Sequence, residues 1–188
     1  MFVRTDFPQP VEVPANHSAV TSTRLATTLG RGDATVGTVE HLLSALFGLG
    51  IDNVRVEVDG PEIPVMDGSA ASFVFLIRAA GIFDQGVPRR SLRVRRPIEV
   101  RDGDRLIRIE PARDLRVTYS VDFAHPSIGR QQLRDLMIDD ESFESEICRA
   151  RTFGFLREVE ALWRSGLARG GNLDNTVVMD DFRVLNRD

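Results

Sequence analysis

The sequence predicts an α+β protein, because segments with strand periodicity and segments with helix periodicity alternate along its 188 residues. Residues 38–49 carry apolar side chains at helical spacing, and residues 70–81 repeat that pattern. Residues 53–59 and 115–123 instead alternate between apolar and polar side chains, which is typical of strands with one buried face. The chain therefore combines strands and helices in both of its halves.

The remaining elements follow from turn and cap signals. Residues 1–14 contain three prolines and predict a loop with one short edge strand, and residues 18–29 predict a strand. A hairpin is expected around Asp102-Gly103. Further expected elements are helices over 140–150 and 155–164 and a short strand at 177–178.

A linker near residues 85–91 predicts two domains. The first spans residues 1–86 and includes the helix that begins near Thr38. The second spans residues 92–188. Each half contains strands and helices, although their order agrees too loosely to demonstrate an internal repeat.

Composition excludes several classes of chemistry. All 24 basic residues are Arg, so mechanisms that need a lysine are excluded. The single cysteine, Cys148, excludes a disulfide framework and a cysteine-rich zinc site. A net charge of −4 does not favour nucleic-acid binding. No apolar stretch is long enough for a membrane span and no signal peptide opens the chain, so we expect a cytoplasmic protein.

Glu40 and His41 stand together at the start of the first predicted helix. A carboxylate beside an imidazole is suited to a general base next to a metal ligand. The same pair also fits a purely structural role, since an acidic residue is favoured at a helix N-terminus and a lone histidine is commonly packed or capping. The residues alone leave both interpretations open.

Three other groups have a functional and a structural interpretation. Asp122, Phe123 and His125 end a strand, where they could bind a base or sugar or simply form a buried turn. The arginines of residues 89–96 could contact phosphate or form a solvated face. Asp174, Asp180 and Asp181 could bind a hard cation or belong to turns.

Seven segments of the sequence, which follow one another in the family's order, resemble the UDP-3-O-acyl-N-acetylglucosamine deacetylases. These are the zinc amidases of lipid A synthesis in Gram-negative bacteria. The first of them is Thr-Val-Glu-His at 38–41, within the longer match 38–46, and the third includes Met-Asp-Gly-Ser at 66–69. The segments are 38–46, 50–53, 61–70, 122–126, 149–155, 170–175 and 180–186.

The resemblance implies two α+β domains, each a β-sheet packed on helices, whose helical layers face each other. It also implies a Zn²⁺ ion that binds the substrate acetamide, held by two histidines and one aspartate. Glu40 matches the general base of this family and His41 matches its first zinc ligand.

Further roles are carried over by the same resemblance. Thr152 and Phe153 match residues that contact the substrate beside the metal, and Asp122 and Phe123 match the uridine pocket. Arg105 stands where the family often has a lysine near the diphosphate. An insert over about 153–185 matches the passage for the acyl chain, with four candidate lining residues: Leu156, Val159, Ala168 and Val178.

Two zinc ligands of the family, in a His-x-x-x-Asp helix, and a further catalytic histidine have no counterpart in this sequence. The second domain and the site are therefore expected to be incomplete. The family's opening strands are also without a match, so the first domain is expected to lack them. His17 and His125 do not match those roles. We therefore expect this polypeptide to be inactive alone, and by resemblance to be monomeric.

Two alternatives stay open. One is a non-catalytic remnant that binds a UDP-sugar. The other is an RNA-binding α+β domain that uses the arginines of residues 89–96, although the acidic net charge disfavours it.

Overall fold

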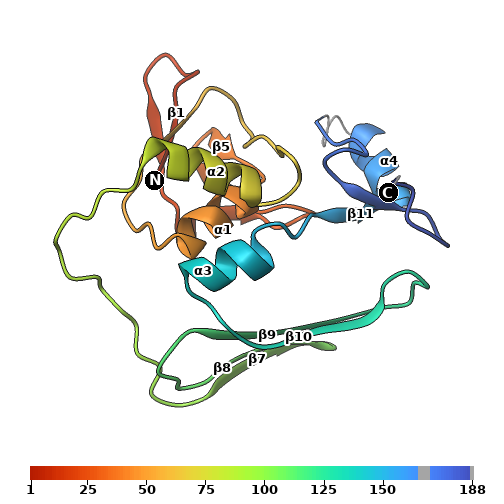
Figure 1. Cartoon of the computed structure of the whole chain (residues 1–188). Helices are drawn as coiled ribbons and strands as arrows, with labels where there is room; N and C mark the ends of the chain where they lie inside the picture. Colours follow the sequence, from red (N-terminus) through yellow and green to blue (C-terminus); the bar gives the residue numbers. More distant parts are fainter. Residues whose placement is uncertain (165–169, 187–188) are drawn as a thin grey trace.

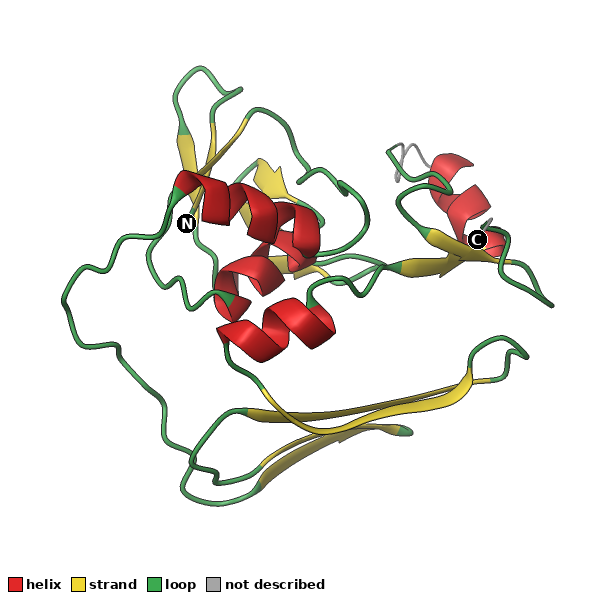
Figure 2. Cartoon of the chain, in the orientation of Figure 1, coloured by secondary structure: helices red, strands yellow, loops and turns green. Residues whose placement is uncertain are grey.

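The computed structural model describes residues 1–164 and 170–186 and confirms an α+β chain (Figure 1). Helices α1, α2 and α3 lie close together, with small sheets on either side of them (Figure 2). None of the described helices is long and apolar enough to cross a bilayer.

One three-stranded sheet is centred on β1 (Phe2–Arg4). This strand pairs antiparallel with β2 (Val11–Val13) and parallel with β6 (Val56–Val58). The expectation of a loop and one edge strand at residues 1–14 was therefore wrong for β1. Three residues are too few to display a period, yet Phe2 and Val3 are at most 1% exposed because they form the centre of the sheet.

Arg4 of β1 is buried, and its charge is matched by Asp6. The guanidinium forms two hydrogen bonds to the Asp6 carboxylate, at 2.8 and 2.6 Å, and also donates to the carbonyl of Thr35. These bonds from Arg4 lower the pKa of Asp6. The planar guanidinium group of Arg4 thus joins this first sheet to the second sheet of the chain, which contains Thr35.

The second sheet has the antiparallel order β3 (Val20–Ser22), β4 (Thr28–Arg31) and β5 (Ala34–Val36). A short 3₁₀ helix, η1 (His17–Ala19), precedes it. Where we expected one strand over 18–29 the chain reverses, with Leu25 in the left-handed region at φ 61°. The Thr- and Ser-rich composition conceals this turn because it carries no glycine or proline.

Helices α1 (Glu40–Gly48) and α2 (Ala71–Ala80) confirm the two helices with the clearest periodicity. Their apolar faces bury Leu42, Ala45, Leu46, Phe73 and Val74. They share one hydrophobic core with the first two sheets. This core fixes the direction of α1, and therefore the place of Glu40 and His41.

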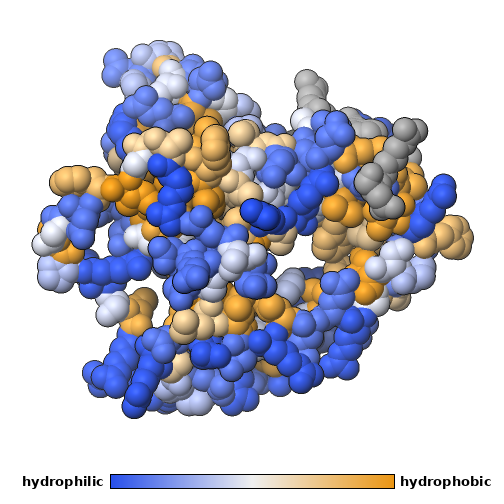
Figure 3. Space-filling view, viewed as in Figure 1, coloured by the Kyte–Doolittle hydropathy of each residue, from blue (hydrophilic) through white to orange (hydrophobic). Residues whose placement is uncertain are grey.

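The strands of residues 98–137 form two antiparallel hairpins. They are β7 (Ile98–Asp102) with β8 (Arg105–Ile109), and β9 (Arg116–Phe123) with β10 (Gly129–Met137). The turn at Asp102-Gly103 is confirmed, with Gly103 at φ 60°. Strand β10 was not expected, because its mostly polar sequence shows no alternation and its pairing with β9 supplies the order. Apolar side chains remain exposed here, including Val100 and Ile107, and Figure 3 shows apolar groups on this part of the surface.

The helix expected over 140–150 is shorter and irregular. It consists of α3 (Asp140–Ser142), with Asp139 in a capping box, followed by the π-helical turn η2 (Phe143–Ile147). Phe143 and Cys148 insert into the core of α1 and α2. Arg78 of α2 adds an ion pair to Glu144 at 2.5 Å.

The last unit is β11 (Phe153–Phe155), α4 (Leu156–Arg164) and β12 (Val177–Met179), with the two strands parallel. Helix α4 and strand β12 were expected, and β11 was not. Its three residues lie between Arg151-Thr152 and the helix, which leaves no room for a visible period. The division into domains at residues 86–92 stays a prediction, although residues 140–148 pack on the earlier half.

Replacement of Gly48 tests the docking of Phe143 on α1. A Cβ at Gly48 would overlap with the Phe143 ring, which is 4% exposed. We expect Gly48→Ala to lower the free energy of unfolding by about 1–2 kcal/mol in urea titrations followed by circular dichroism, even though alanine favours helix. Gly60→Ala is the control, since nothing lies within 4 Å of a Cβ there. A stability equal to wild type would contradict this packing.

Candidate functional site

The candidate site begins at the first turn of α1. Glu40 is the first helical residue and is exposed, and His41 beside it is half-buried. Val39, the preceding residue, is fully buried and supplies no side-chain cap. Thr38 has φ 55°, a left-handed conformation that costs a β-branched residue about 1–3 kcal/mol. A strained turn thus presents Glu40 and His41 next to each other.

The carboxylate of Glu40 has a fixed partner. Its Oε1 atom accepts a hydrogen bond from the backbone amide of Thr27, in the segment that leads into β4. An amide donor holds a carboxylate without neutralising it. One oxygen of Glu40 is therefore oriented, next to the positive end of the α1 dipole.

The segment 61–63 braces the start of α1. The Gly37 amide donates to the Pro61 carbonyl at 2.8 Å, and the Ile63 amide donates to the Gly37 carbonyl at 3.0 Å. Between them, the Thr38 hydroxyl donates to Oε1 of Glu62 at 2.6 Å. The residues before the helix are thus bonded to the loop that follows β6.

Asp67 organises the next part of this loop. Its carboxylate accepts hydrogen bonds from the hydroxyls of Ser69, at 2.9 Å, and Ser72, at 2.8 Å, and from the Ser69 amide. Partial burial raises the pKa of Asp67, but the hydrogen bonds from Ser72 and Ser69 outweigh it, so the pKa is lowered overall. The network fixes the turn that precedes α2.

Gly68 is the contact point between this loop and the end of the chain. The Thr152 amide donates to the Gly68 carbonyl at 2.7 Å. Gly68 has φ 83°, and a Cβ there would overlap with the carbonyl oxygen of Asn175. Arg151 bridges the same parts by donating to the carbonyls of Asp67, at 3.2 Å, and Asp174. Three motifs that are distant in the sequence therefore meet at one glycine.

Hydrogen bonds between side chain and backbone hold the turn that contacts Gly68. Asn175 accepts from the Asn172 amide at 2.8 Å and donates to the Gly170 carbonyl at 2.8 Å. Asn186 donates to the carbonyls of Leu173 and Thr176. The asparagines thus give shape to a turn without regular secondary structure.

An aromatic cluster lies beside this junction. The ring centroids of Phe123 and Phe153 are 5.5 Å apart with perpendicular planes, and Phe155 lies 6.0 Å from Phe123. Phe123 is half-buried and Phe153 is 44% exposed, so the cluster is open to solvent on one side. Asp122, the neighbour of Phe123 on β9, is exposed. Such a cluster suits the stacking of a planar ring.

His125 extends the cluster but has a structural role in this structure. Its ring lies 5.7 Å from Phe155 and it is 8% exposed. Nδ1 accepts from the Ser127 amide at 3.2 Å, which leaves the proton on Nε2 to be donated to the Asp180 carbonyl at 2.7 Å. Nδ1 thus shapes the turn after β9, and Nε2 joins that turn to the segment after β12.

The other predicted residues lie in two places. Leu156 and Val159 are half-buried on α4, and Val178 is buried on β12, so these three share one unit. Arg105 is exposed at the start of β8, in the hairpin of β7 and β8, which we call the outer hairpin. Ala168 lies outside the described residues.

Metal binding by the described residues is limited. Within residues 1–164 and 170–186, no three His, Cys, Asp or Glu side chains gather as a metal would need. His41 is a ligand type that zinc accepts, but zinc sites in proteins use three or four protein ligands. The residues described thus do not by themselves form a complete zinc site.

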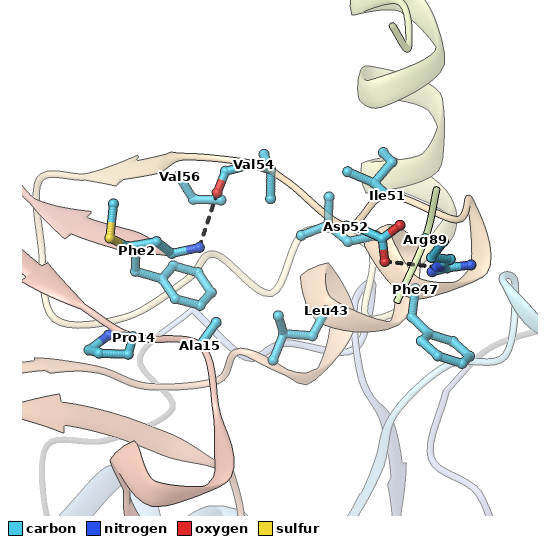
Figure 4. A pocket seen from close by; sticks show the side chains of 12 residues that line it. Phe2, Pro14, Ala15, Leu43, Phe47, Ile51, Asp52, Val54, Val56 and Arg89 are labelled. Carbon is cyan, nitrogen blue, oxygen red and sulfur yellow. Dashed lines mark hydrogen bonds and ion pairs between the residues drawn. The ribbon is translucent and has the colours of Figure 1, made fainter. Parts of the chain in front are cut away.

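One pocket lies away from these residues. Its cavity of about 520 Å³ is bounded by side chains of β1, of the distal part of α1 and of the chain that precedes β6, including Phe2, Leu43 and Phe47 (Figure 4). Asp52 and Arg89 form an ion pair of 2.9 Å at its edge. Apart from Arg89, none of the candidate residues lines it.

Sequence reasoning did not single out Gly68, Arg151 or Asn175. All three stand inside segments that carry the family resemblance, yet only neighbouring residues were given roles. The Asp67-Gly68 pair is a turn signal, and nothing in the spacing shows which backbone approaches it. The contact is visible only in the structure.

Comparisons with known proteins agree on one family. A family model described as UDP-3-O-acyl N-acetylglycosamine deacetylase matches residues 1–188. A protein from Myxococcus xanthus (strain DK1622) named UDP-3-O-acyl-N-acetylglucosamine deacetylase is 53% identical over 188 residues, which cover all of this chain and 60% of that protein. A protein of the same name from Acidithiobacillus ferrooxidans (strain ATCC 53993 / BNL-5-31) is 50% identical over 190 residues and 62% of its length. The chain thus spans about three fifths of these relatives.

The lowered pKa of Asp67 predicts a pH-dependent contribution to stability. Because the folded pKa lies below the usual 3.8, the stabilisation is complete at pH 7 and is lost as the pH falls through the folded pKa. We expect Asp67→Asn to lower the free energy of unfolding by about 1 kcal/mol at pH 7, and by less at pH 3. Asp33→Asn, in an exposed turn, is the control. A loss that does not depend on pH would contradict the assignment.

Gly68→Ala tests the junction. We expect the added methyl group to separate residues 67–69 from Asn175 and to expose the Thr152 amide, which would then exchange with deuterium at least about 10-fold faster. Gly32→Ala is the matched control, since Gly32 also has a positive φ, 58°, but nothing within 4 Å of a Cβ. Equal effects of the two variants would mean that backbone strain alone is responsible.

Proposed function

This chain belongs to the UDP-3-O-acyl N-acetylglycosamine deacetylase family, and we propose that it provides the base and the nucleotide-binding surface of a deacetylase acting on UDP-3-O-acyl-N-acetylglucosamine in lipid A synthesis. One observation carries the proposal. Glu40 and His41 lie together at the start of α1, and hydrogen bonds through residues 61–69 connect that turn to Thr152.

Glu40 is the proposed general base. The Thr27 amide orients Oε1, and Oε2 has no hydrogen-bond partner among the described residues. Amide hydrolysis requires a water molecule to lose a proton as it attacks the acetamide carbon. We assign acceptance of that proton to Glu40, the first residue of α1.

His41 is the proposed first zinc ligand. Zinc in a hydrolase polarises the substrate carbonyl and activates water. Since the described residues do not complete a zinc site, we assign no catalytic step to the metal. In the proposal, His41 supplies the imidazole nitrogen that would bind the zinc ion, and it does so next to Glu40, the general base.

Recognition of the nucleotide is assigned to the aromatic cluster. Phe123 and Phe153 present ring surfaces on which a uracil can stack, with the Asp122 carboxylate beside them as a hydrogen-bond acceptor. Arg105 is the proposed partner of the diphosphate, because its guanidinium can bind two phosphate oxygens at once. Thr152 is the proposed contact to the sugar.

The acyl chain is assigned to the unit of β11, α4 and β12. Leu156, Val159 and Val178 provide apolar surface on two of its elements. Ala168, the fourth candidate, lies outside the described residues. Burial of methylene groups contributes about 0.8 kcal/mol each, so an acylated substrate is expected to bind more tightly than its sugar nucleotide alone.

We propose that this polypeptide by itself binds the UDP-sugar without hydrolysing it. The absence of a three-ligand group among the described residues supports this non-catalytic alternative. Acetate release is measured with and without added Zn²⁺, and none is expected. Stoichiometric zinc binding with steady deacetylation would overturn the proposal of inactivity.

Phe123→Ala tests nucleotide binding. A stacked base contributes about 1–3 kcal/mol, so the variant is expected to bind UDP about 10-fold more weakly in calorimetric titrations. Phe83→Ala removes a phenylalanine that is 86% exposed, outside the cluster, and serves as the control. Wild-type protein that does not bind UDP, or an unchanged affinity in Phe123→Ala, would contradict the assignment.

A further inference from the structure

We propose that Glu62 is a positioning residue for Glu40 and His41. Its carboxylate holds Thr38 in the left-handed conformation from which α1 starts. The inference rests on the proposed function, in which Glu40 and His41 act on the substrate. It adds a residue of the loop after β6 to the control of their geometry.

Thr38 needs an external partner to keep its conformation. Its φ of 55° lies in a region that β-branched residues rarely adopt. The next residue, Val39, offers no oxygen to cap the amides of the first turn, so the helix start lacks the side-chain hydrogen bond that commonly fixes it. The direction of that turn therefore depends on the contacts of Thr38.

Glu62 is placed to supply that contact. Its Oε1 accepts the hydrogen bond of the Thr38 hydroxyl at 2.6 Å. The residues on both sides are fixed, because Pro61 and Ile63 are hydrogen-bonded to Gly37 and Ile63 is 3% exposed. The Glu62 side chain itself is exposed. An exposed hydrogen bond contributes little to global stability, so the effect of Glu62 is local.

The consequence reaches Glu40 through the backbone. Relaxation of Thr38 to a negative φ would change the direction of the chain just before the helix. The Glu40 carboxylate would then move away from the Thr27 amide, and the His41 ring would move with the same turn. Glu62 thus acts through Thr38 and does not contact the substrate.

The test compares Glu62→Ala, Glu62→Gln and Thr38→Gly by NMR at one fixed pH. With three histidines in the chain, the ring protons of His41 can be assigned by single substitutions of the other two. We expect Glu62→Ala to shift the His41 ring signals and the Thr27 amide signal. Glu62→Gln keeps an oxygen acceptor and is expected to restore both. In a Thr38→Gly background, Glu62→Ala should have little effect, because glycine adopts a positive φ freely.

Glu110→Ala, at an exposed position in the outer hairpin, is the control, and thermal unfolding is measured in parallel. Unchanged His41 and Thr27 signals in Glu62→Ala would overturn the inference. So would an effect of Glu62→Ala that persists in Thr38→Gly, or a fall in unfolding temperature without these shifts. Failure of the UDP titrations together with the expected shifts would contradict only the proposed function.

Discussion

The close approach of Asn175 to Gly68 is the constraint on which the arrangement of the candidate site depends. A carbonyl oxygen occupies the space that any side chain at position 68 would need, and the Thr152 amide bonds to the carbonyl of the same glycine. Arg151 joins the two segments through the backbone carbonyls of Asp67 and Asp174. Backbone groups thus make the contact, and their geometry tolerates little variation compared with pairs of long side chains.

The same principle applies at the start of α1. The Glu40 carboxylate accepts a hydrogen bond from a backbone amide, and the Glu62 carboxylate accepts one from a hydroxyl. The backbone around them is held by the β-bridge between Gly37 and Glu62. Few of these groups are deeply buried, so each bond adds little to the stability of the fold. Their combined effect is to restrict orientation, which is what proton transfer from a bound water requires.

The sequence predicted the long elements that have a clear period, and it missed the short strands β1 and β11. Helices α1 and α2 and strand β9 have enough residues to display their period, whereas β1 and β11 have three each. Strand β10 depends on its neighbour for order, which no local pattern reveals. Residue type and helix position drew attention to the pair Glu40-His41 but left a structural role open, and the roles proposed for it came from the family resemblance. The roles of Gly68 and Glu62 depend on which distant backbone meets them, and that information is tertiary.

The packing of Phe143 on Gly48 has a consequence for synthesis of the chain. The core around α1 and α2 is completed by a ring that leaves the ribosome long after those helices do. Until then the bare backbone at Gly48 and its apolar neighbours lack this cover, and exposed apolar surface makes a partly folded chain prone to aggregation. Native contacts so far apart in sequence also make closure slow, because the intervening loop must lose its freedom before the ring can dock.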